Sequence, residues 1–218
     1  MTEALPRLLD ELERLGLTAT FFVEAINCEL YPEAISGIAR RGHELGVHGW
    51  RHESWAGLPA DREHRLIERA TAAFSALGIS VEGFRPPGGG MNPATPGILR
   101  AAGLRWCSPE GAAFTARDGI AYVPFDWELV DAYHLMGAFA DLRAARGDPR
   151  RPLTVAEAER RLLAGLTGDG NRTLIMHPFL MLEPDWWVSV KRLLEIVAGG
   201  EMAVAPGGAV AVAVAGGC

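Results

Sequence analysis

Apolar residues along the chain switch between helical spacing and strand-like runs. Leucines at positions 5, 8, 9, 12 and 15 have the spacing of one helical face, and Gly16 ends this pattern. The next run, Leu17–Val23, is apolar and rich in Thr and Phe, which favours a buried strand. We therefore expect a helix that leads directly into a strand.

The same order repeats along the chain. The expected helix–strand pairs are residues 32–41 before 44–48, 60–77 before 81–84, 93–102 before 105–108, 155–166 before 173–177, and 186–198 before 202–205. This alternation predicts an α/β protein whose parallel sheet is flanked by helices and is either open or closed into a barrel. Residues 140–152 are predicted to be a surface excursion, and the Ala/Val/Gly tail after Pro206 a last edge strand.

Composition limits the size of the domain and the class of partner. A chain of 218 residues, 49% of them hydrophobic, is long enough for one domain with a buried core, and we predict one domain over residues 1–218. The net charge is −6 and the basic residues are scattered among acidic ones, which disfavours nucleic acid and anionic membrane surfaces as partners. A neutral or cationic small substrate fits better, and a homo-oligomer stays open.

Cysteine usage and the first residues bear on the compartment. Cys28, Cys107 and Cys218 are far apart and show no CxxC spacing, so a reducing, cytoplasmic setting is expected. Acidic residues such as Glu3 and Asp10 lie within the first expected helix. Neither a signal peptide nor a membrane span tolerates charges there, so we predict neither.

The segment His48-Gly-Trp-Arg-His52 carries two histidines four residues apart, where a strand runs out into a loop or a first helical turn. Imidazoles at this spacing share one face of a helical turn and can hold one divalent ion, for which zinc is the common choice. A catalytic zinc usually takes three protein ligands, so a third must come from elsewhere. The alternative is that both histidines cap or pack.

Three further segments place polar residues at expected strand ends. They present Arg85 in Phe84-Arg-Pro-Pro-Gly88, Asp126 beside Trp127, and His177. Arg85 can bind a carboxylate with both nitrogens, and an Asp bonded to a His keeps that imidazole aimed as a general acid. Each residue alone is better explained as a turn or core-edge residue, but four such segments together indicate an active site at the carboxyl ends of the strands.

In order, these segments resemble the successive motifs of the polysaccharide deacetylases, the NodB-like family. The matching stretches are Thr18–Val23, Gly42–His52, the Arg85 turn, Asp126-Trp127 and Leu174-x-x-His177, and the resemblance covers roughly residues 4–200. It implies a distorted (β/α) barrel with one divalent metal ion, zinc or a similar ion, at the mouth formed by the carboxyl ends of its strands.

The resemblance also implies a role for each residue. His48 and His52 match the two metal-binding histidines, Arg85 the arginine that tethers the catalytic base, Asp126 the carboxylate that orients the acid, and His177 the general acid. Trp127, Pro87 and Gly88 are assigned to substrate binding. Trp50, Trp55, Trp106 and Trp127 are candidates for a sugar-stacking cleft, but tryptophans at strand ends are as often core residues. The implied reaction is metal-assisted hydrolysis of an amide, typically an N-acetyl group on an amino sugar.

Two departures from the family stand out. The family places a first strand, ending in an acidic pair that supplies the base and the third metal ligand, before the opening helix, whereas this sequence begins at that helix. We therefore expect that the barrel lacks its first strand and that the functional protein starts upstream. Glu24 and Glu53 are weak substitutes as ligands. Gly49 stands where the family usually has Ser or Thr.

Three functions remain open from the sequence. The first is deacetylation of an N-acetylated amino sugar or a related polysaccharide-derived substrate. The second is hydrolysis of a cyclic amide or imide, as in allantoinase-type enzymes, at the same metal site. The third is a non-catalytic barrel that has lost its acids and serves as a binding module.

Overall fold

The computed structural model describes residues 3–167, 170–200 and 203–217. The chain forms two compact units. Leu17–Pro124 and Val204–Cys218 make up the sheet unit, and Met1–Gly16 and Phe125–Ala203 make up the helical unit. The prediction of one domain over the whole chain stays a prediction.

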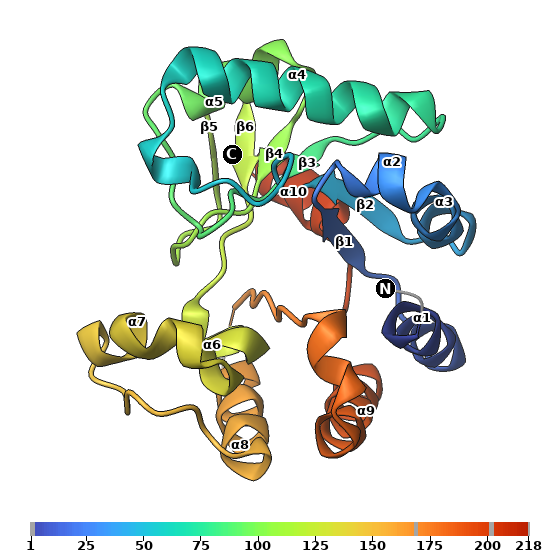
Figure 1. Ribbon diagram of the computed structural model, residues 1–218, viewed down its shortest axis with the longest axis vertical. Helices are drawn as coiled ribbons and strands as arrows, with labels where there is room; N and C mark the ends of the chain where they lie inside the picture. The colour runs from blue at the N-terminus through green and yellow to red at the C-terminus, as the bar shows by residue number, and fades with distance from the viewer. Residues whose placement is uncertain (1–2, 168–169, 201–202, 218) are drawn as a thin grey trace. The chain divides into compact units, whose positions relative to one another are not determined.

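The sheet unit contains all the named strands of the described residues (Figure 1). Its elements are β1 (Thr20–Val23), α2 (Asn27–Leu30), α3 (Pro32–Arg40), β2 (Glu44–Val47), η1 (Trp55–Gly57), α4 (Ala60–Ala76), β3 (Gly83–Phe84), α5 (Thr95–Ala101), β4 (Trp106–Cys107), β5 (Thr115–Arg117), β6 (Ile120–Tyr122) and α10 (Gly207–Gly216).

The strands form one sheet in the order β1-β2-β3-β4-β6-β5. Neighbours are parallel from β1 to β6, and β5 pairs antiparallel with β6. The register sets Phe22, Gly46, Gly83 and Trp106 side by side across four strands. Because side chains alternate along a strand, this row shares one face of the sheet and the residues that follow share the other.

Two glycines make room for two large rings on the first face. A Cβ on Gly46 would lie 2.7 Å from Phe22 Cε1, and a Cβ on Gly83 would lie 2.4 Å from the Trp106 ring. The two rings meet edge to face with their centroids 5.4 Å apart. A larger residue at Gly46 would displace the partly buried Phe22 ring, and one at Gly83 would displace the buried Trp106 ring.

Helix α10 packs on this face, where Ala211 lies in one apolar cluster with Trp106 (Figure 1). Its first turn is held by polar contacts, because Gly207 N donates to Thr20 Oγ1 at 2.7 Å and Gly208 N donates to Glu44 Oε2 at 2.9 Å. A carboxylate at a helix N-terminus also complements the helix dipole. The predicted edge strand after Pro206 is therefore wrong, and these residues form a helix.

Helix α4 covers the opposite face of the sheet (Figure 1). Phe84 points to this side and meets the Trp55 ring at a centroid distance of 4.8 Å. Trp55 Nε1 in turn donates to Glu63 Oε1 of α4 at 3.0 Å, and both residues are fully buried. Ile67 and Phe74 add to the buried stripe of α4. The contacts of Trp55 with Phe84 and Glu63 hold the segment that follows β2 in place.

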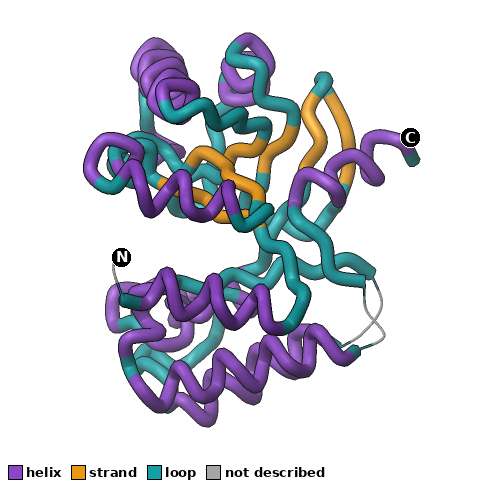
Figure 2. Tube along the Cα trace, turned by 90° about the vertical axis from the view of Figure 1, so that its right-hand side faces the viewer, coloured by secondary structure: helices purple, strands orange, loops and turns teal. Residues whose placement is uncertain are grey.

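The described part of the helical unit consists of helices and loops, as Figure 2 shows by colour. Its elements are α1 (Ala4–Arg14), η2 (Trp127–Leu129), α6 (Asp131–Leu135), η3 (Gly137–Phe139), α7 (Ala140–Ala145), α8 (Val155–Leu166), η4 (Pro178–Leu182) and α9 (Pro184–Gly199). Arg14 pairs with Glu195 at 2.7 Å and so ties α1 to α9. Helix α8 begins at a capping box formed by Thr154 and Glu157.

The expected surface excursion at residues 140–152 is wrong in part. It contains α7, and Arg143 on that helix is only 1% exposed. The guanidinium donates to the backbone carbonyls of Tyr133, Met136, Pro149 and Arg150. A buried cation with its donors satisfied in this way holds the segment in place.

Apart from these corrections, the structure confirms most of the expected helices. It does not confirm the strands that were expected late in the chain. The strand predicted at residues 173–177 reduces to a single parallel bridge between Ile175 and Val130. Residues 203–205 of the strand predicted at 202–205 are not extended in a sheet, and Met202 lies outside the described residues. The short α2 and β5 are additions that the sequence patterns missed.

Candidate active site

His48 lies directly after β2, and its backbone N–H still donates to Val23 of β1 at 2.9 Å. Its ring Nδ1 lies 2.8 Å from the backbone oxygen of Arg85. Because a carbonyl oxygen only accepts, Nδ1 must carry the proton, and the lone pair is on Nε2. This is the usual arrangement of a metal-binding histidine, whose second nitrogen is held by an outer hydrogen bond.

His52 lies in the loop that follows, with φ at 61° in the left-handed region. Its ring centroid is 5.0 Å from that of His48, with the planes at 80°. The sequence predicted this pairing on a loop or a first helical turn, and it is realised on a loop. Left-handed backbone at a residue with a side chain costs free energy, so its surroundings must fix it.

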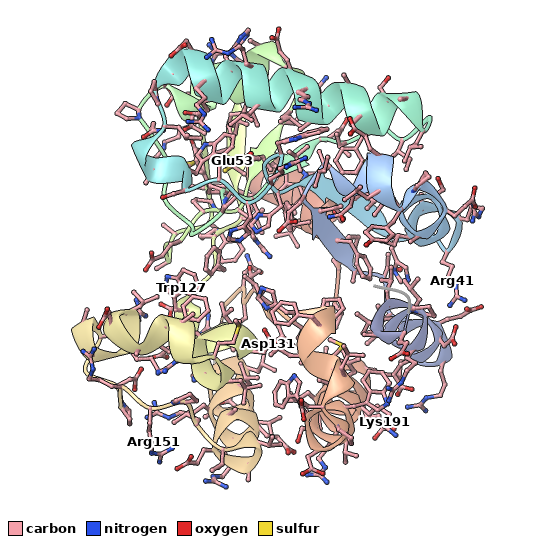
Figure 3. All side chains as sticks on the ribbon, in the orientation of Figure 1. Arg41, Glu53, Trp127, Asp131, Arg151 and Lys191 are labelled. Carbon is pink, nitrogen blue, oxygen red and sulfur yellow. The ribbon has the colours of Figure 1, made fainter. Side chains whose placement is uncertain are left out.

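Glu53 fixes this loop (Figure 3). Its carboxylate accepts the backbone N–H groups of Trp50 at 3.0 Å and Arg51 at 3.0 and 3.1 Å. These bonds occupy both carboxylate oxygens within the loop, which disfavours Glu53 as a metal ligand. Gly49, which departs from the family's Ser or Thr, has φ at 72°, and a Cβ there would lie 2.9 Å from Glu53 Oε2.

Arg85 follows β3 and is half-buried. Its guanidinium donates to the hydroxyl of the buried Ser108 at 2.9 and 3.2 Å and stacks on the Phe22 ring at 4.3 Å. Burial lowers the pKa of Arg85 to about 9, so it stays a cation at neutral pH. Arg85 contacts the His48 ring through its backbone carbonyl oxygen, and its role as the arginine that tethers a base stays a prediction.

The turn after Arg85 carries the two other residues assigned to substrate binding. Pro87 is buried and borders the histidine loop, because its Cγ would lie 3.2 Å from a Cβ on residue 49. Gly88 is exposed, with φ at 77°. Pro87 therefore supports the loop by packing, and Gly88 offers backbone only.

His177 lies in the helical unit, just before η4, and its imidazole is held by a buried carboxylate. Its ring Nδ1 lies 2.6 Å from Asp131 Oδ1, and its backbone N–H donates to Asp131 Oδ2 at 2.7 Å. Asp131 is fully buried and also accepts from Ala132 N at 2.6 Å. The carboxylate fixes the ring and favours a proton on Nδ1, so Nε2 is the nitrogen that can exchange protons with a substrate.

The assignment of Asp126 as the orienting carboxylate is corrected, because Asp131, which is labelled in Figure 3, holds His177. The Asp126 side chain is 51% exposed, pairs with Arg146 at 2.7 Å and caps η2 by accepting from Glu128 N at 2.8 Å. A sequence signal for Asp131 exists: it is the single charge in the apolar run Leu129–Tyr133. A charge in such a run is stable only when it is paired or hydrogen-bonded.

Trp127 does not provide an open stacking face, because it is 8% exposed. Its ring, labelled in Figure 3, packs against Phe125, Tyr133 and Phe139 in an apolar cluster of the helical unit. Trp50, Trp55 and Trp106 are 3%, 0% and 2% exposed. The expectation that these four tryptophans line a sugar-binding cleft is therefore wrong for this structure.

His48 and His52 fit a divalent ion by donor type, with one imidazole already oriented through Nδ1. Across residues 3–167, 170–200 and 203–217, however, no group of three or more His, Cys, Asp or Glu side chains is arranged to hold a metal. The described residues thus supply two of the three ligands that a catalytic zinc normally takes.

The family model for polysaccharide deacetylase matches residues 1–107. This stretch includes β1, the histidine loop and the Arg85 turn. Over these residues, about half of its length, the chain matches the polysaccharide deacetylase family. Its mixed α/β architecture with a six-stranded sheet is consistent with the distorted barrel of that family.

Relatives of known activity match about two fifths of the chain. Chitin deacetylase 1 from Saccharomyces cerevisiae is 36% identical over 94 residues, which is 43% of this chain and 31% of the relative. The peptidoglycan-N-acetylglucosamine deacetylase from Bacillus cereus is 32% identical over 88 residues, 40% of this chain and 32% of the relative. The matched stretch spans about a third of the length of each of these relatives.

Solved structures match nearly the whole chain. A candidate polysaccharide deacetylase from Mycobacterium smegmatis superposes with a TM-score of 0.85 at 29% identity, covering 98% of this chain and 77% of the other. An allantoinase superposes with a TM-score of 0.72 at 15% identity, covering 96% of this chain and 71% of the other. A pseudoenzyme of the CE4 family from Bacillus anthracis superposes with a TM-score of 0.68 at 15% identity, covering 96% of this chain and 60% of the other. At that identity they show the fold alone.

Proposed function

We propose that this protein hydrolyses the N-acetyl group of an N-acetylated amino sugar or polysaccharide, releasing acetate and a free amine. The observation that carries the proposal is the His177–Asp131 pair, with its 2.6 Å bond to a fully buried carboxylate. An amide is cleaved only if the departing amine is protonated, and a fixed imidazole with Nε2 available suits that step. The deacetylase names of the relatives support the same reaction.

We assign His48 and His52 as two ligands of a divalent metal, with zinc the natural choice for nitrogen donors. When bound, such an ion polarises the amide carbonyl and lowers the pKa of water to about 7. The His48 bond to the Arg85 carbonyl orients one ligand, and Glu53 holds the loop that carries the other. The Arg85 guanidinium is held by Ser108 and the Phe22 ring and supplies a fixed positive charge after β3.

We assign the general acid to His177. It donates a proton from Nε2 to the amine nitrogen as the carbon–nitrogen bond breaks, and Asp131 stabilises the imidazolium before that transfer. General acid catalysis of this kind contributes about 10²- to 10⁴-fold to a rate. The base that activates water is not assigned to any of the residues that the structure describes.

Acetate release from tetra-N-acetylchitotetraose by the zinc-supplemented chain tests this proposal. We expect release by the wild type and a loss of at least about 10²-fold in His177→Ala. His64→Ala is the matched control, because His64 lies on α4 with a side chain 48% exposed. No release by the wild type above a protein-free blank, or equal release by His177→Ala, would overturn the proposal.

A second candidate is a non-catalytic member that binds ligands without turning them over. The two-ligand donor set among the described residues favours it, because two imidazoles hold zinc less firmly than three ligands. Equilibrium dialysis against zinc separates the candidates, with His48→Ala, His52→Ala and His64→Ala side by side. Loss of about one zinc per chain in the first two variants only would favour the enzyme.

None of the described helices is long and apolar enough to cross a bilayer. A cytoplasmic location and a homo-oligomer stay predictions.

A further inference from the structure

Sugar-binding sites commonly need an exposed aromatic face, and the tryptophans of this chain do not offer one at the positions that the motifs indicated. A pyranose ring presents an apolar face of C–H groups, which packs on the flat face of an aromatic side chain. Phe179 offers such a face, because it is 53% exposed. It lies two residues after His177, on η4 of the same unit.

The ring of Phe179 is next to the ring of the proposed acid. The two ring centroids are 5.5 Å apart, with the planes tilted by 57°. Since Asp131 holds Nδ1 of His177, the imidazole meets substrate through its other edge. A sugar whose acetamido group reaches that edge therefore has its own ring, or the ring of the adjoining sugar, within reach of Phe179.

The segment that carries Phe179 is held in place rather than loose. Pro178 fixes φ at the first position of η4, and Leu180 N donates to the His177 carbonyl at 3.0 Å. Met181 is 1% exposed and anchors the inner side of this short helix. Side chains three apart eclipse in a 3-10 helix, so Leu182, 49% exposed, lies on the same side as Phe179.

A fixed apolar surface beside a catalytic group loses little conformational entropy when a ligand covers it. Exposed apolar residues are common on proteins, and exposure alone carries no functional meaning. The combination here is more specific: an exposed ring, a rigid helix beneath it, and direct ring contact with the proposed acid.

We propose that Phe179, flanked by Leu182, is the stacking platform for a sugar ring of an N-acetylated oligosaccharide. This inference rests on the proposed function, since it names the substrate-binding residue of the same site. Phe179 acts as a specificity residue: it favours N-acetylated oligosaccharides over small acetylated amines, which have no sugar ring to stack.

The affinity of the 218-residue protein for tetra-N-acetylchitotetraose tests the platform without any need for turnover. Isothermal titration calorimetry would compare the wild type with Phe179→Ala, Phe179→Trp and Ile196→Ala. Ile196 is 45% exposed on α9 of the same unit, roughly 18 Å along the helix from its start, so it is a matched apolar control. Thermal melts would establish that every variant is folded.

We expect Phe179→Ala to raise Kd about five- to tenfold, the equivalent of about 1 kcal/mol for covering half a Phe side chain. Phe179→Trp and Ile196→Ala should stay within about twofold of the wild type. A Kd for Phe179→Ala equal to that for Ile196→Ala, or no binding by the folded wild type, would overturn the platform.

Acetate release, measured in parallel, keeps the two proposals apart. If Phe179→Ala weakens binding and the wild type releases no acetate, the platform stands and the deacetylase proposal falls. If acetate is released with the same KM by the wild type and Phe179→Ala, the deacetylase proposal stands and the platform falls.

Discussion

Replacing Asp131 with Asn tests the correction from Asp126 to Asp131 directly. The Asp131 carboxylate accepts three N–H donors at 2.6–2.7 Å: His177 Nδ1 and N, and Ala132 N. The amide of Asn has nearly the same shape but only one oxygen. Whichever way it turns, its NH₂ group faces at least one of these donors, so a buried N–H loses its acceptor.

An unsatisfied buried donor costs about 1–3 kcal/mol. At the middle of that range, Asp131→Asn should lower Tm by roughly 4–8 °C for a chain of this size. The orientation of His177 is lost as well, so acetate release should fall by at least about 10²-fold. Differential scanning calorimetry and the acetate assay measure the two effects independently.

Asp126→Asn is the matched control. Asp126 is half-exposed in its pair with Arg146, and such a pair contributes about 0–1 kcal/mol. Asn also serves well as a cap, so η2 should keep its N-terminal bond. If Asp126→Asn lowered activity and Tm as much as Asp131→Asn, the reasoning from the buried carboxylate would be refuted.

Three further predictions follow from the sheet and helical units. Gly49→Ala should lower the free energy of unfolding by about 1–2 kcal/mol, because φ is left-handed and the new Cβ meets Glu53. Gly57→Ala, which has open space around it, should change that free energy little, and equal urea midpoints for the two variants would contradict this prediction. Burial lowers the pKa of His134, so on acidification the unfolded state takes up the proton first, and stability should fall as the pH drops below about 6.5. His134→Gln should flatten that part of a plot of Tm against pH, and an unchanged plot would contradict this prediction. Trp106→Ala should cost about 3–5 kcal/mol by calorimetry and loosen α10, and hydrogen exchange in α10 as slow as in the wild type would oppose the packing described.

Local patterns predicted most helices well, because their signals lie within the segment. Val155–Leu166 matched its expected bounds, since its apolar spacing and the Thr154 capping box both fall inside the same stretch. The tail after Pro206 was misjudged for the opposite reason. Its alternation of Ala and Val suits a strand or a helix, and contacts with the distant Thr20 and Glu44 decide for a helix.

The distance between partners along the sequence also decided which parts of the candidate site could be predicted. The pairing of His48 with His52 could be predicted because both lie on one short loop. The partner of His177 was misassigned, because it is 46 positions away and the Asp126-Trp127 motif favoured Asp126 over the single charge at Asp131 in an apolar run. The exposure of aromatic side chains could not be predicted either, because the sequence does not distinguish a buried ring beside a motif, such as Trp127, from an exposed one, such as Phe179.

The central claim is that this chain carries a metal-dependent deacetylase centre, and acetate release measured against zinc concentration tests it most directly. For the wild type, we predict release from tetra-N-acetylchitotetraose that rises with zinc and saturates, and for His48→Ala a curve that stays at the blank or needs far more zinc. Release that is independent of zinc, or identical curves for the wild type and His48→Ala, would contradict the claim.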